Sequence, residues 1–329
     1  MRAVVVGAGA VGARAARQIH DTPGVADLVV VDVDARRSAA VADSLGAPAR
    51  VETWSHDLLD AADLLLLAHP VGHRTMAEAA LERGTSVVSV TDSVEEVRSL
   101  LRLDAEASER GLVVAVGAGF APGLSCLLAR HAGADLTAVD EVHVAKSGTG
   151  GPACARHHHR ALAGEAIDWR HGAWLRRPAG SGRELCWFPD PVGGLDCYRA
   201  ALPDPMLLRG AFPRAERLTA RVSATRRDRI TARLPMLRRP HAEATIGAIR
   251  VEVRGRQGAA TDTRTLGVLD RPAVAAGTVA AVAAVWIDER RMARPGAAGL
   301  GELVADPLPF LQALAARGIR AAVFEGAAP

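Results

Sequence analysis

A glycine-rich loop near the N-terminus constrains the fold of this chain more than any other feature. It reads Gly7-Ala8-Gly9-Ala10-Val11-Gly12, a complete G-x-G-x-x-G pattern. An apolar run over residues 3–6 precedes the loop, and a helix-forming stretch over residues 10–20 follows it. A strand, such a loop and a helix in this order are typical of a dinucleotide-binding α/β unit. The alternative interpretation is a glycine-rich turn that binds no ligand.

Two features of this region predict how a dinucleotide would be held. Gly7 and Gly12 permit the tight turn and close packing, and Gly9 lets a pyrophosphate approach the helix N-terminus. Asp32, twenty residues after Gly12, can bind a ribose hydroxyl and would repel a 2′-phosphate, which favours NAD. Arg36 and Arg37 could clamp a 2′-phosphate instead, so NADP is the alternative. The predicted cofactor contacts are Gly7, Gly9, Ala10, Val11, Gly12, Asp32, Arg36 and Pro70.

Alternating strand and helix patterns predict a doubly wound parallel sheet in the first part of the chain. The expected strands are 3–6, 28–31, 63–68, 86–90 and 112–116, and the expected helices are 10–20, 35–45, 74–83 and 101–110. After Pro122 the alternation of strands and helices gives way to longer strand-like runs, at 137–145, 217–225, 245–255 and 261–268. Helices are expected at 272–288 and 306–317. We therefore predict an α/β protein with a Rossmann domain at 1–121 and an α+β domain with a mixed or antiparallel sheet at 122–297.

Charge and composition exclude several classes of protein. The chain carries 40 basic and 37 acidic residues, and its net charge of +3 is too balanced to indicate nucleic-acid binding. The longest apolar stretch, 273–287, is shorter than the ~20 residues of a membrane span. No signal-peptide pattern precedes the glycine loop, so we expect a cytoplasmic protein. The four cysteines lack C-x₂-C spacing, so we expect no metal site and reduced thiols.

Candidate catalytic residues follow the expected parallel strands, because ligands of open α/β sheets lie beyond the carboxyl ends of the strands. His69 follows the leucine-rich strand and could carry a proton, or be a loop histidine. Asp92 follows the next strand and could hold a substrate ammonium, or cap the following helix. His69 and His73 are four residues apart, as in a helical metal-binding pair. Pro70 and Gly72 lie between them and disfavour a helix, so such a pair is not expected. The run 157–159 is three histidines that cannot converge on one metal from a helix, so we expect it at the surface.

Lys146 is the third candidate because it is the single lysine among 40 lysine and arginine residues. The chain also has no asparagine and one tyrosine, a bias in which arginine replaces lysine wherever the chemistry allows. Lysine can exchange a proton at accessible pH and arginine cannot. Lys146 is expected at the end of a strand, before the glycine-rich loop 147–152, where it could bind a carboxylate or exchange a proton with a substrate amine. The alternative is a surface lysine retained by chance.

These motifs together resemble the saccharopine dehydrogenase-like proteins, especially the lysine 6-dehydrogenase branch. The matching segments are the glycine loop 7–12, Gly119-Phe120-Ala121-Pro122-Gly123-Leu124-Ser125, the stretch 255–287 and the tail from 307 to 319. The resemblance implies a second domain that binds substrate and dimerises. It also implies that the C-terminal segment, about 298–329, returns to the Rossmann domain.

The function implied is NAD(P)-linked oxidation or reduction at a C–N bond of an amino acid or amine. The expected partners are therefore a small-molecule amino acid or amine and a second copy of the chain, with no nucleic acid and no membrane. Two alternatives are a dinucleotide-binding regulatory protein without turnover and a C–N lyase or cyclase that keeps its NAD bound. The predicted catalytic residues are Lys146, His69 and Asp92.

Overall fold

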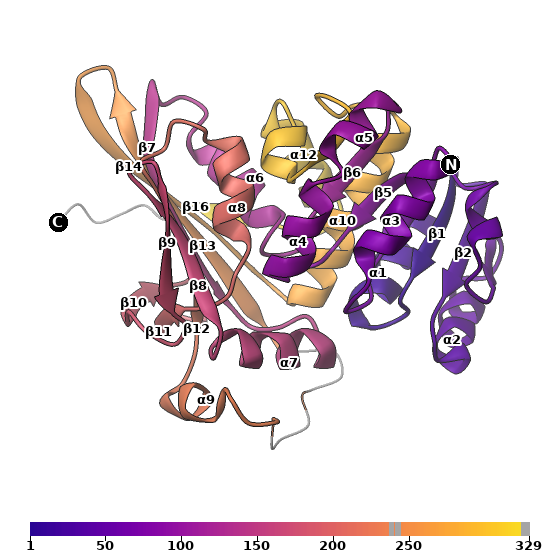
Figure 1. The fold of residues 1–329 in the computed structure, drawn as a ribbon, viewed down its shortest axis with the longest axis horizontal. Coiled ribbons are helices and arrows are strands. Elements are labelled where there is room, and N and C mark those ends of the chain that lie inside the picture. The colour runs from indigo at the N-terminus through magenta and orange to yellow at the C-terminus, as the bar shows by residue number, and fades with distance from the viewer. Residues whose placement is uncertain (237–239, 241–244, 324–329) are drawn as a thin grey trace. The chain divides into compact units, whose positions relative to one another are not determined.

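The chain forms two compact units in the computed structural model, which describes residues 1–236, 240 and 245–323 (Figure 1). Unit 1 comprises Met1–Gly123 and Ala273–Ala305. Unit 2 comprises Leu124–Pro272 and Asp306–Pro329. In the described ranges no helix combines the length and the apolar character needed to cross a bilayer.

Unit 1 is built on a seven-stranded sheet in which every neighbouring pair is parallel. Its order is β15-β6-β5-β4-β1-β2-β3, so six of its strands follow the 3-2-1-4-5-6 arrangement of a dinucleotide-binding fold. The strands are β1 (Arg2–Val6), β2 (Asp27–Val31), β3 (Ala49–Val51), β4 (Leu64–Leu67), β5 (Ser86–Ser89), β6 (Val113–Val116) and β15 (Gly296–Ala298). The helices are α1 (Ala10–His20), α2 (Ala35–Leu45), η1 (His56–Leu59), α3 (His73–Glu82), α4 (Val94–Leu101), α5 (Asp104–Glu109), α10 (Pro272–Asp288) and α11 (Leu300–Leu303). The predicted doubly wound sheet is confirmed.

The central strands have the sequence that a sheet covered on both faces requires. All four leucines of β4 are buried, and so are the last four residues of β1. Because both faces of a parallel sheet are packed under helices, every position of such a strand is apolar. The order of the strands changes direction between β1 and β4, and this switch point places the loops after Val6 and Leu67 next to each other.

Helix α10 belongs to unit 1 except for its first residue, which corrects the predicted boundary at 297. The cause is a close approach to α1 at Gly277. A Cβ atom on Gly277 would lie 2.7 Å from the Cβ of Arg14 and 2.9 Å from the carbonyl oxygen of Val11. The glycine therefore lets two helix backbones pack against each other. An apolar, Ala-rich helix indicates burial, but its sequence does not identify the domain that buries it.

Gly277→Ala is expected to destabilise the protein, although alanine favours a helix over glycine by about 1 kcal/mol. The added methyl group would overlap the backbone of α1, and overpacking of this kind costs about 1–3 kcal/mol. We expect a lower midpoint of thermal unfolding and a smaller free energy of unfolding in urea. A higher midpoint, as helix propensity alone predicts, would contradict the close packing of α10 on α1.

Unit 2 is built on a mixed sheet of order β10-β11-β12-β7-β13-β14-β16; β8 also pairs with β12, and β9 pairs with β8. Its strands are β7 (Ala138–Ser147), β8 (Glu165–Arg170), β9 (Ala173–Pro178), β10 (Glu184–Trp187), β11 (Gly194–Arg199), β12 (Arg217–Ser223), β13 (Gly247–Gln257), β14 (Ala260–Asp270) and β16 (Ala321–Val323). The helices are α6 (Leu124–Ala132), α7 (Pro152–Ala161), α8 (Asp204–Ala211), α9 (Arg226–Thr231) and α12 (Pro307–Ala316). Only β7 and β12 pair in parallel; the other pairs are antiparallel.

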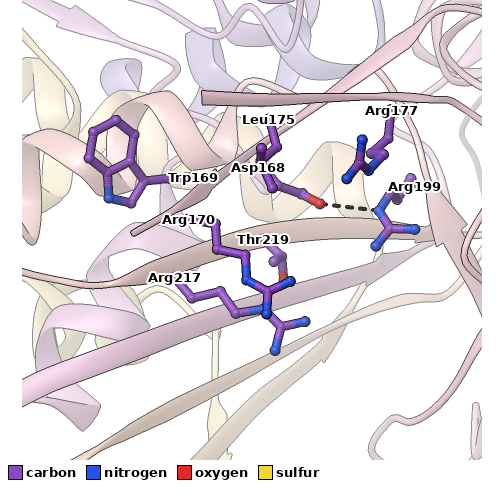
Figure 2. Close-up of a pocket in the computed structure, with 8 residues that line it drawn as sticks. All are labelled: Asp168, Trp169, Arg170, Leu175, Arg177, Arg199, Arg217 and Thr219. Carbon is purple, nitrogen blue, oxygen red and sulfur yellow. Dashed lines mark hydrogen bonds and ion pairs between the residues drawn. The ribbon is translucent and has the colours of Figure 1, made fainter. Parts of the chain in front are cut away.

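The two faces of this sheet differ in chemistry. Val144 of β7 lies beside Ala220 of β12 and Val251 of β13, and these buried residues face helices α6 and α8. The alternate positions form what we call the polar face. It carries His143 beside Thr219 and Glu252, and a pocket lined by arginines (Figure 2).

The C-terminal segment does not follow the expectation that all of 298–329 returns to the Rossmann domain. Residues 298–305 belong to unit 1, but α12 belongs to unit 2 and contacts α6. The buried residues of α12 are Pro307, Phe310 and Leu314, whereas Leu308 is exposed. Leu308, Leu311 and Leu314 recur at a spacing of three but do not form the buried face, which passes through Phe310 instead. The part of the segment beyond residue 323 lies outside the described residues.

Candidate dinucleotide site and catalytic residues

Two glycines of the N-terminal loop are required by the fold itself. Gly7 has φ +104°, and a Cβ there would lie 2.7 Å from the carbonyl group of Ala68. A Cβ on Gly12 would lie 1.6 Å from the carbonyl oxygen of Gly7. A larger residue at either position would push apart the loop and the helix that follows it. These two glycines are thus explained without a ligand.

Gly9 is different, because the folded chain does not need a glycine there. It caps α1 with φ −76° and ψ −170°, which any residue adopts, and a Cβ would have no neighbour within 4 Å. Beside this open space, the first amides of α1, at Ala10 and Val11, have no acceptor within the helix. A helix N-terminus with free amides and room for close approach suits the pyrophosphate of a dinucleotide. The site therefore fits the cofactor that its sequence predicts.

Asp32 is fixed at the end of β2 by the glycine loop. Its Oδ2 accepts a hydrogen bond of 2.6 Å from the Ala8 amide, and its Oδ1 accepts one of 2.8 Å from the Asp34 amide. The carboxylate is thereby oriented next to the loop, and each oxygen keeps a lone pair for a ribose hydroxyl.

Asp34 is a second carboxylate at this edge that sequence reasoning missed. It caps α2 by accepting from the Arg36 amide, and its side chain lies 3.3 Å from the guanidinium of Arg37. Arg37 is therefore already paired, while the side chain of Arg36 is exposed. Aspartate directly before a helix is a preferred cap, and this signal could have identified Asp34. Two carboxylates here disfavour a 2′-phosphate.

His69 and His73 form a stacked pair beside the glycine loop. Their ring centroids are 4.5 Å apart with an angle of 23° between the planes. His73 is fully buried: its Nε2–H donates to the carbonyl of His69 over 2.7 Å, and its Nδ1 accepts from the hydroxyl of Ser89 over 2.7 Å. His73 is the first residue of α3 and Gly72 is its cap, with φ +85°, so residues 69–72 precede the helix and the two histidines do not form a helical pair, as predicted. These bonds make His73 a support for the loop that carries His69.

The pKa values of both histidines are lowered, and burial is the main cause. Burial, with a smaller effect of His73, lowers the pKa of His69 to about 4, although the negative charge of Asp32 partly opposes this. Burial also lowers the pKa of His73. His69 is thus neutral near pH 7 and can donate or accept one hydrogen bond, but it is a weak proton acceptor.

The lowered pKa of His69 predicts a loss of stability in mild acid. The folded state binds a proton less readily than the unfolded state, so stability is complete above pH 6.5 and is lost as the pH falls toward about 4. The loss attributable to His69 is about 2–3 kcal/mol. His69→Gln should lose less stability than the wild type between pH 7 and pH 4, measured by urea unfolding at both values. An unchanged pH dependence would contradict the assignment.

The other unit 1 candidates occupy the expected edge. Asp92 follows β5 and is partly buried, but the cap of α4 is Ser93, whose hydroxyl accepts from the amide of Glu96. The capping alternative for Asp92 is therefore wrong. Pro70 is exposed beside His69. Its contact with a cofactor stays a prediction, as does the binding of an ammonium group by Asp92.

Lys146 lies in unit 2 and is 2% exposed, so the surface alternative is wrong. Strand β7 continues to Ser147, which places Lys146 inside the strand rather than at its end. It pairs with Val222 on one side and Ile249 on the other, in the apolar layer of the sheet. The chain thus buries its one lysine among aliphatic neighbours, just before the turn at Gly148, which has φ +82°.

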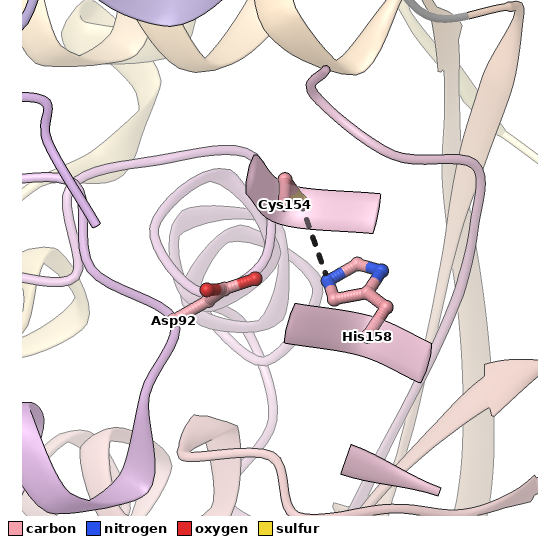
Figure 3. Close-up of side chains that lie close together, drawn as sticks. All are labelled: Asp92, Cys154 and His158. Carbon is pink, nitrogen blue, oxygen red and sulfur yellow. Dashed lines mark hydrogen bonds between the residues drawn. The ribbon is translucent and has the colours of Figure 1, made fainter. Parts of the chain in front are cut away.

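The histidine run on α7 is not a surface feature. His158 and His159 are each 8% exposed, and Nε2 of His159 bonds the carbonyl of Thr231 over 2.9 Å. His158 lies one helical turn from Cys154, with 3.6 Å between Nε2 and Sγ (Figure 3). The spacing of four residues could have identified this cysteine–histidine pair, because i and i+4 side chains share a helix face.

Comparisons with known proteins agree with this fold. Residues 1–118 match the family model GFO_IDH_MocA, described as an oxidoreductase family with an NAD-binding Rossmann fold. No curated protein sequence matches the chain. Unit 1 therefore contains an NAD-binding Rossmann fold of the oxidoreductase type, as predicted.

Solved structures resemble the chain over nearly its whole length. Saccharopine dehydrogenase (L-Glu forming) from Saccharomyces cerevisiae has a TM-score of 0.74 at 14% identity, covering 98% of this chain and 99% of that one. Amine dehydrogenase from Mycobacterium smegmatis has a TM-score of 0.53 at 14% identity, covering 93% and 98%. UDP-N-acetylglucosamine 3-dehydrogenase GnnA from Acidithiobacillus ferrooxidans has a TM-score of 0.50 at 17% identity, covering 96% of each chain. The predicted resemblance to saccharopine dehydrogenase-like proteins is thus confirmed for the fold.

Proposed function

We propose that this protein is an NAD-dependent dehydrogenase that acts on a C–N bond of an amino acid or amine. The observation that carries the proposal is the likeness of the whole chain to saccharopine dehydrogenase, combined with the open space at Gly9. The amine dehydrogenase among the similar structures supports the same bond type. Bound NAD would accept or return the hydride. We also propose that the active protein is a cytoplasmic homodimer.

Each candidate residue has a proposed role in this reaction. The amides at the start of α1 bind the pyrophosphate, and Asp32 binds the adenosine ribose. His69, neutral near pH 7, orients bound groups by a hydrogen bond beside the glycine loop. Lys146 binds the substrate carboxylate or exchanges a proton with its amine. Asp92 holds a substrate ammonium.

Asp32→Ala is expected to weaken NADH binding at least tenfold and NADPH binding less. The charge-assisted bond to the ribose is worth about 1.5–3 kcal/mol, and its loss affects NADH most. Removal of the negative charge also relieves repulsion of a 2′-phosphate. Both affinities can be measured by fluorescence titration. A wild type that binds NADPH tenfold tighter than NADH would contradict this interpretation. It would indicate that Arg36 binds the 2′-phosphate of NADP.

Absorbance at 340 nm with a substrate panel tests the proposed reaction. The panel contains the protein, NAD and a series of amino acids, diamino acids and amines, and the reverse panel contains NADH with carbonyl compounds and amines. Reduction of NAD by an amino acid or amine supports the proposal. Turnover without net change at 340 nm would indicate a lyase or cyclase, and binding without turnover would indicate a regulatory protein.

A second candidate is a dehydrogenase of sugar or alcohol hydroxyl groups. It is favoured by the match of residues 1–118 to a broad oxidoreductase family and by the likeness to UDP-N-acetylglucosamine 3-dehydrogenase. Nucleotide sugars and polyols in the same panel distinguish it. Reduction of NAD by these compounds alone would replace the C–N proposal and leave the dinucleotide site unchanged.

A further inference from the structure

A small cavity on the polar face of the unit 2 sheet is lined by four arginines and one carboxylate. Its volume is about 110 Å³, several times the roughly 10–15 Å³ that a water molecule needs. The lining residues come from β8, β9, β11 and β12: Asp168, Trp169, Arg170, Leu175, Arg177, Arg199, Arg217 and Thr219 (Figure 2). The formal charge of this lining is +3, because Asp168 offsets one of the four guanidinium groups.

The strand pattern explains why a cavity opens here. Strands β8 and β11 both add to the same edge of β12, β8 at Arg217–Leu218 and β11 at 221–223. Thr219 lies between the two attachments and is 4% exposed. The gap between β8 and β11 is therefore a feature of the sheet, and the side chains around it project from strands.

The arginines around the gap are incompletely paired. Arg199 bonds Asp168 over 3.1 Å. Arg217 lies 3.7 Å from Glu141, a carboxylate that also bonds His143 over 2.8 Å. In the part of the chain that the structure describes, no carboxylate lies within 4.0 Å of Arg170 or Arg177.

The position of Arg170 adds a second observation. It is the direct cross-strand neighbour of Arg217, and like charges placed opposite each other destabilise a sheet. The fold therefore holds two positive side chains together beside a cavity, at a cost in stability that a bound anion would remove. Arg170 is exposed, so an anion can reach this pair of guanidinium groups from solvent.

We infer that this cavity binds a phosphate group, as inorganic phosphate or as the phosphate of a monoester. The guanidinium fork matches phosphate oxygens with two parallel hydrogen bonds. The arginines are the donors here, because the Thr219 hydroxyl is bonded to Nδ1 of His143 over 2.8 Å. A phosphate group carries about −1.5 to −2 charges near pH 7, which offsets most of the +3 of the lining. The site lies wholly within unit 2 and does not depend on the proposed dehydrogenase activity.

Calorimetric titration of the full-length protein with saturating NAD tests the site. The probes are inorganic phosphate, glycerol 3-phosphate and malonate, and the variants are Arg170→Gln and Arg176→Gln. Arg176 is the matched control because it lies on β9, is 69% exposed and pairs with Glu165 over 3.0 Å. We expect phosphate or its ester to bind the wild type and Arg176→Gln alike, and to bind Arg170→Gln about 10- to 100-fold more weakly. Without phosphate, Arg170→Gln should unfold at a higher temperature than the wild type.

The outcomes separate the sources of the phosphate and the competing explanations. Tighter binding of glycerol 3-phosphate indicates a metabolite, and tighter binding of inorganic phosphate indicates the free ion; each supports the site. The proposed site is overturned if phosphate does not bind, or if it binds Arg170→Gln as tightly as the wild type. It is also overturned if malonate binds more tightly than phosphate. A changed molecular mass of Arg170→Gln in light scattering, without phosphate binding, also overturns it and assigns these arginines to an interface between copies. Because the readout compares two arginine variants, failure of the proposed dehydrogenase activity would not alter it.

Discussion

Gly9→Ala is expected to weaken NAD binding by about 10- to 100-fold while leaving the fold intact. The backbone at Gly9 has angles that alanine adopts readily, and the new Cβ would meet no protein atom within 4 Å. It would instead occupy the space through which a pyrophosphate reaches the amides of α1. Overpacking by one methyl group costs about 1–3 kcal/mol, which corresponds to this loss of affinity.

Titration of NADH fluorescence measures the affinity, and thermal unfolding without cofactor measures the fold. Gly12→Ala is the contrasting variant, because its Cβ would lie 1.6 Å from the carbonyl oxygen of Gly7. We expect Gly12→Ala to lower the unfolding temperature strongly and Gly9→Ala to leave it nearly unchanged. Wild-type NADH affinity in Gly9→Ala would show that the pyrophosphate does not approach Gly9.

The parts of the fold that are local in sequence were predictable. Helices α1, α2 and α10 have the predicted bounds to the residue. Gly46 ends α2 with φ +73°, and proline begins α10, so both signals act through the backbone of their own segment. Five of the seven strands of unit 1 were found because a strand packed on both faces is largely apolar, whereas β3 and β15, with three residues each, were not predicted.

The parts that depend on distant contacts were not predictable. Strands β8 to β11 are short, and pairing places them in the sheet: β8 and β11 pair with β12, β9 pairs with β8, and β10 pairs with β11. The domain to which α10 belongs depends on a contact between Gly277 and α1 that no periodicity encodes. Helix α4 (Val94–Leu101) was not predicted; the predicted helix 101–110 corresponds to α5 (Asp104–Glu109) and overlaps α4 only at Leu101.

The candidate site also combines features that depend on local sequence with features that depend on distant contacts. The glycine loop and Asp32 were found because their roles follow from spacing along the chain. The burial of His73 and His158, and the pairing of Cys154 with His158, depend on neighbours that the fold supplies. The scarcity of lysine singled out Lys146; the residue is buried, and its role in the chemistry stays a prediction. That scarcity did not place the lysine inside a strand.

Lys146→Met is expected to lower turnover by about 10²-fold or more, the usual contribution of a general base. Methionine replaces the amine with an apolar chain of similar length, which suits the aliphatic neighbours Val222 and Ile249. Lys146 is not among the residues predicted to contact the cofactor, so NAD affinity should stay near the wild-type value. Steady-state kinetics with the substrate identified at 340 nm and NADH titration measure the two effects.

Lys146→Arg distinguishes a proton carrier from a carboxylate ligand. Arginine keeps the positive charge but cannot cycle a proton at accessible pH, so a base would be lost and a binding residue largely preserved. Because Lys146 is 2% exposed, the larger guanidinium must also be accommodated, and urea unfolding of this variant controls for overpacking. A folded Lys146→Arg protein with a normal kcat and a raised KM would make Lys146 a carboxylate ligand. Wild-type kinetics in Lys146→Met would instead remove Lys146 from the mechanism and leave His69 and Asp92, at the ends of β4 and β5, as the remaining candidate catalytic residues.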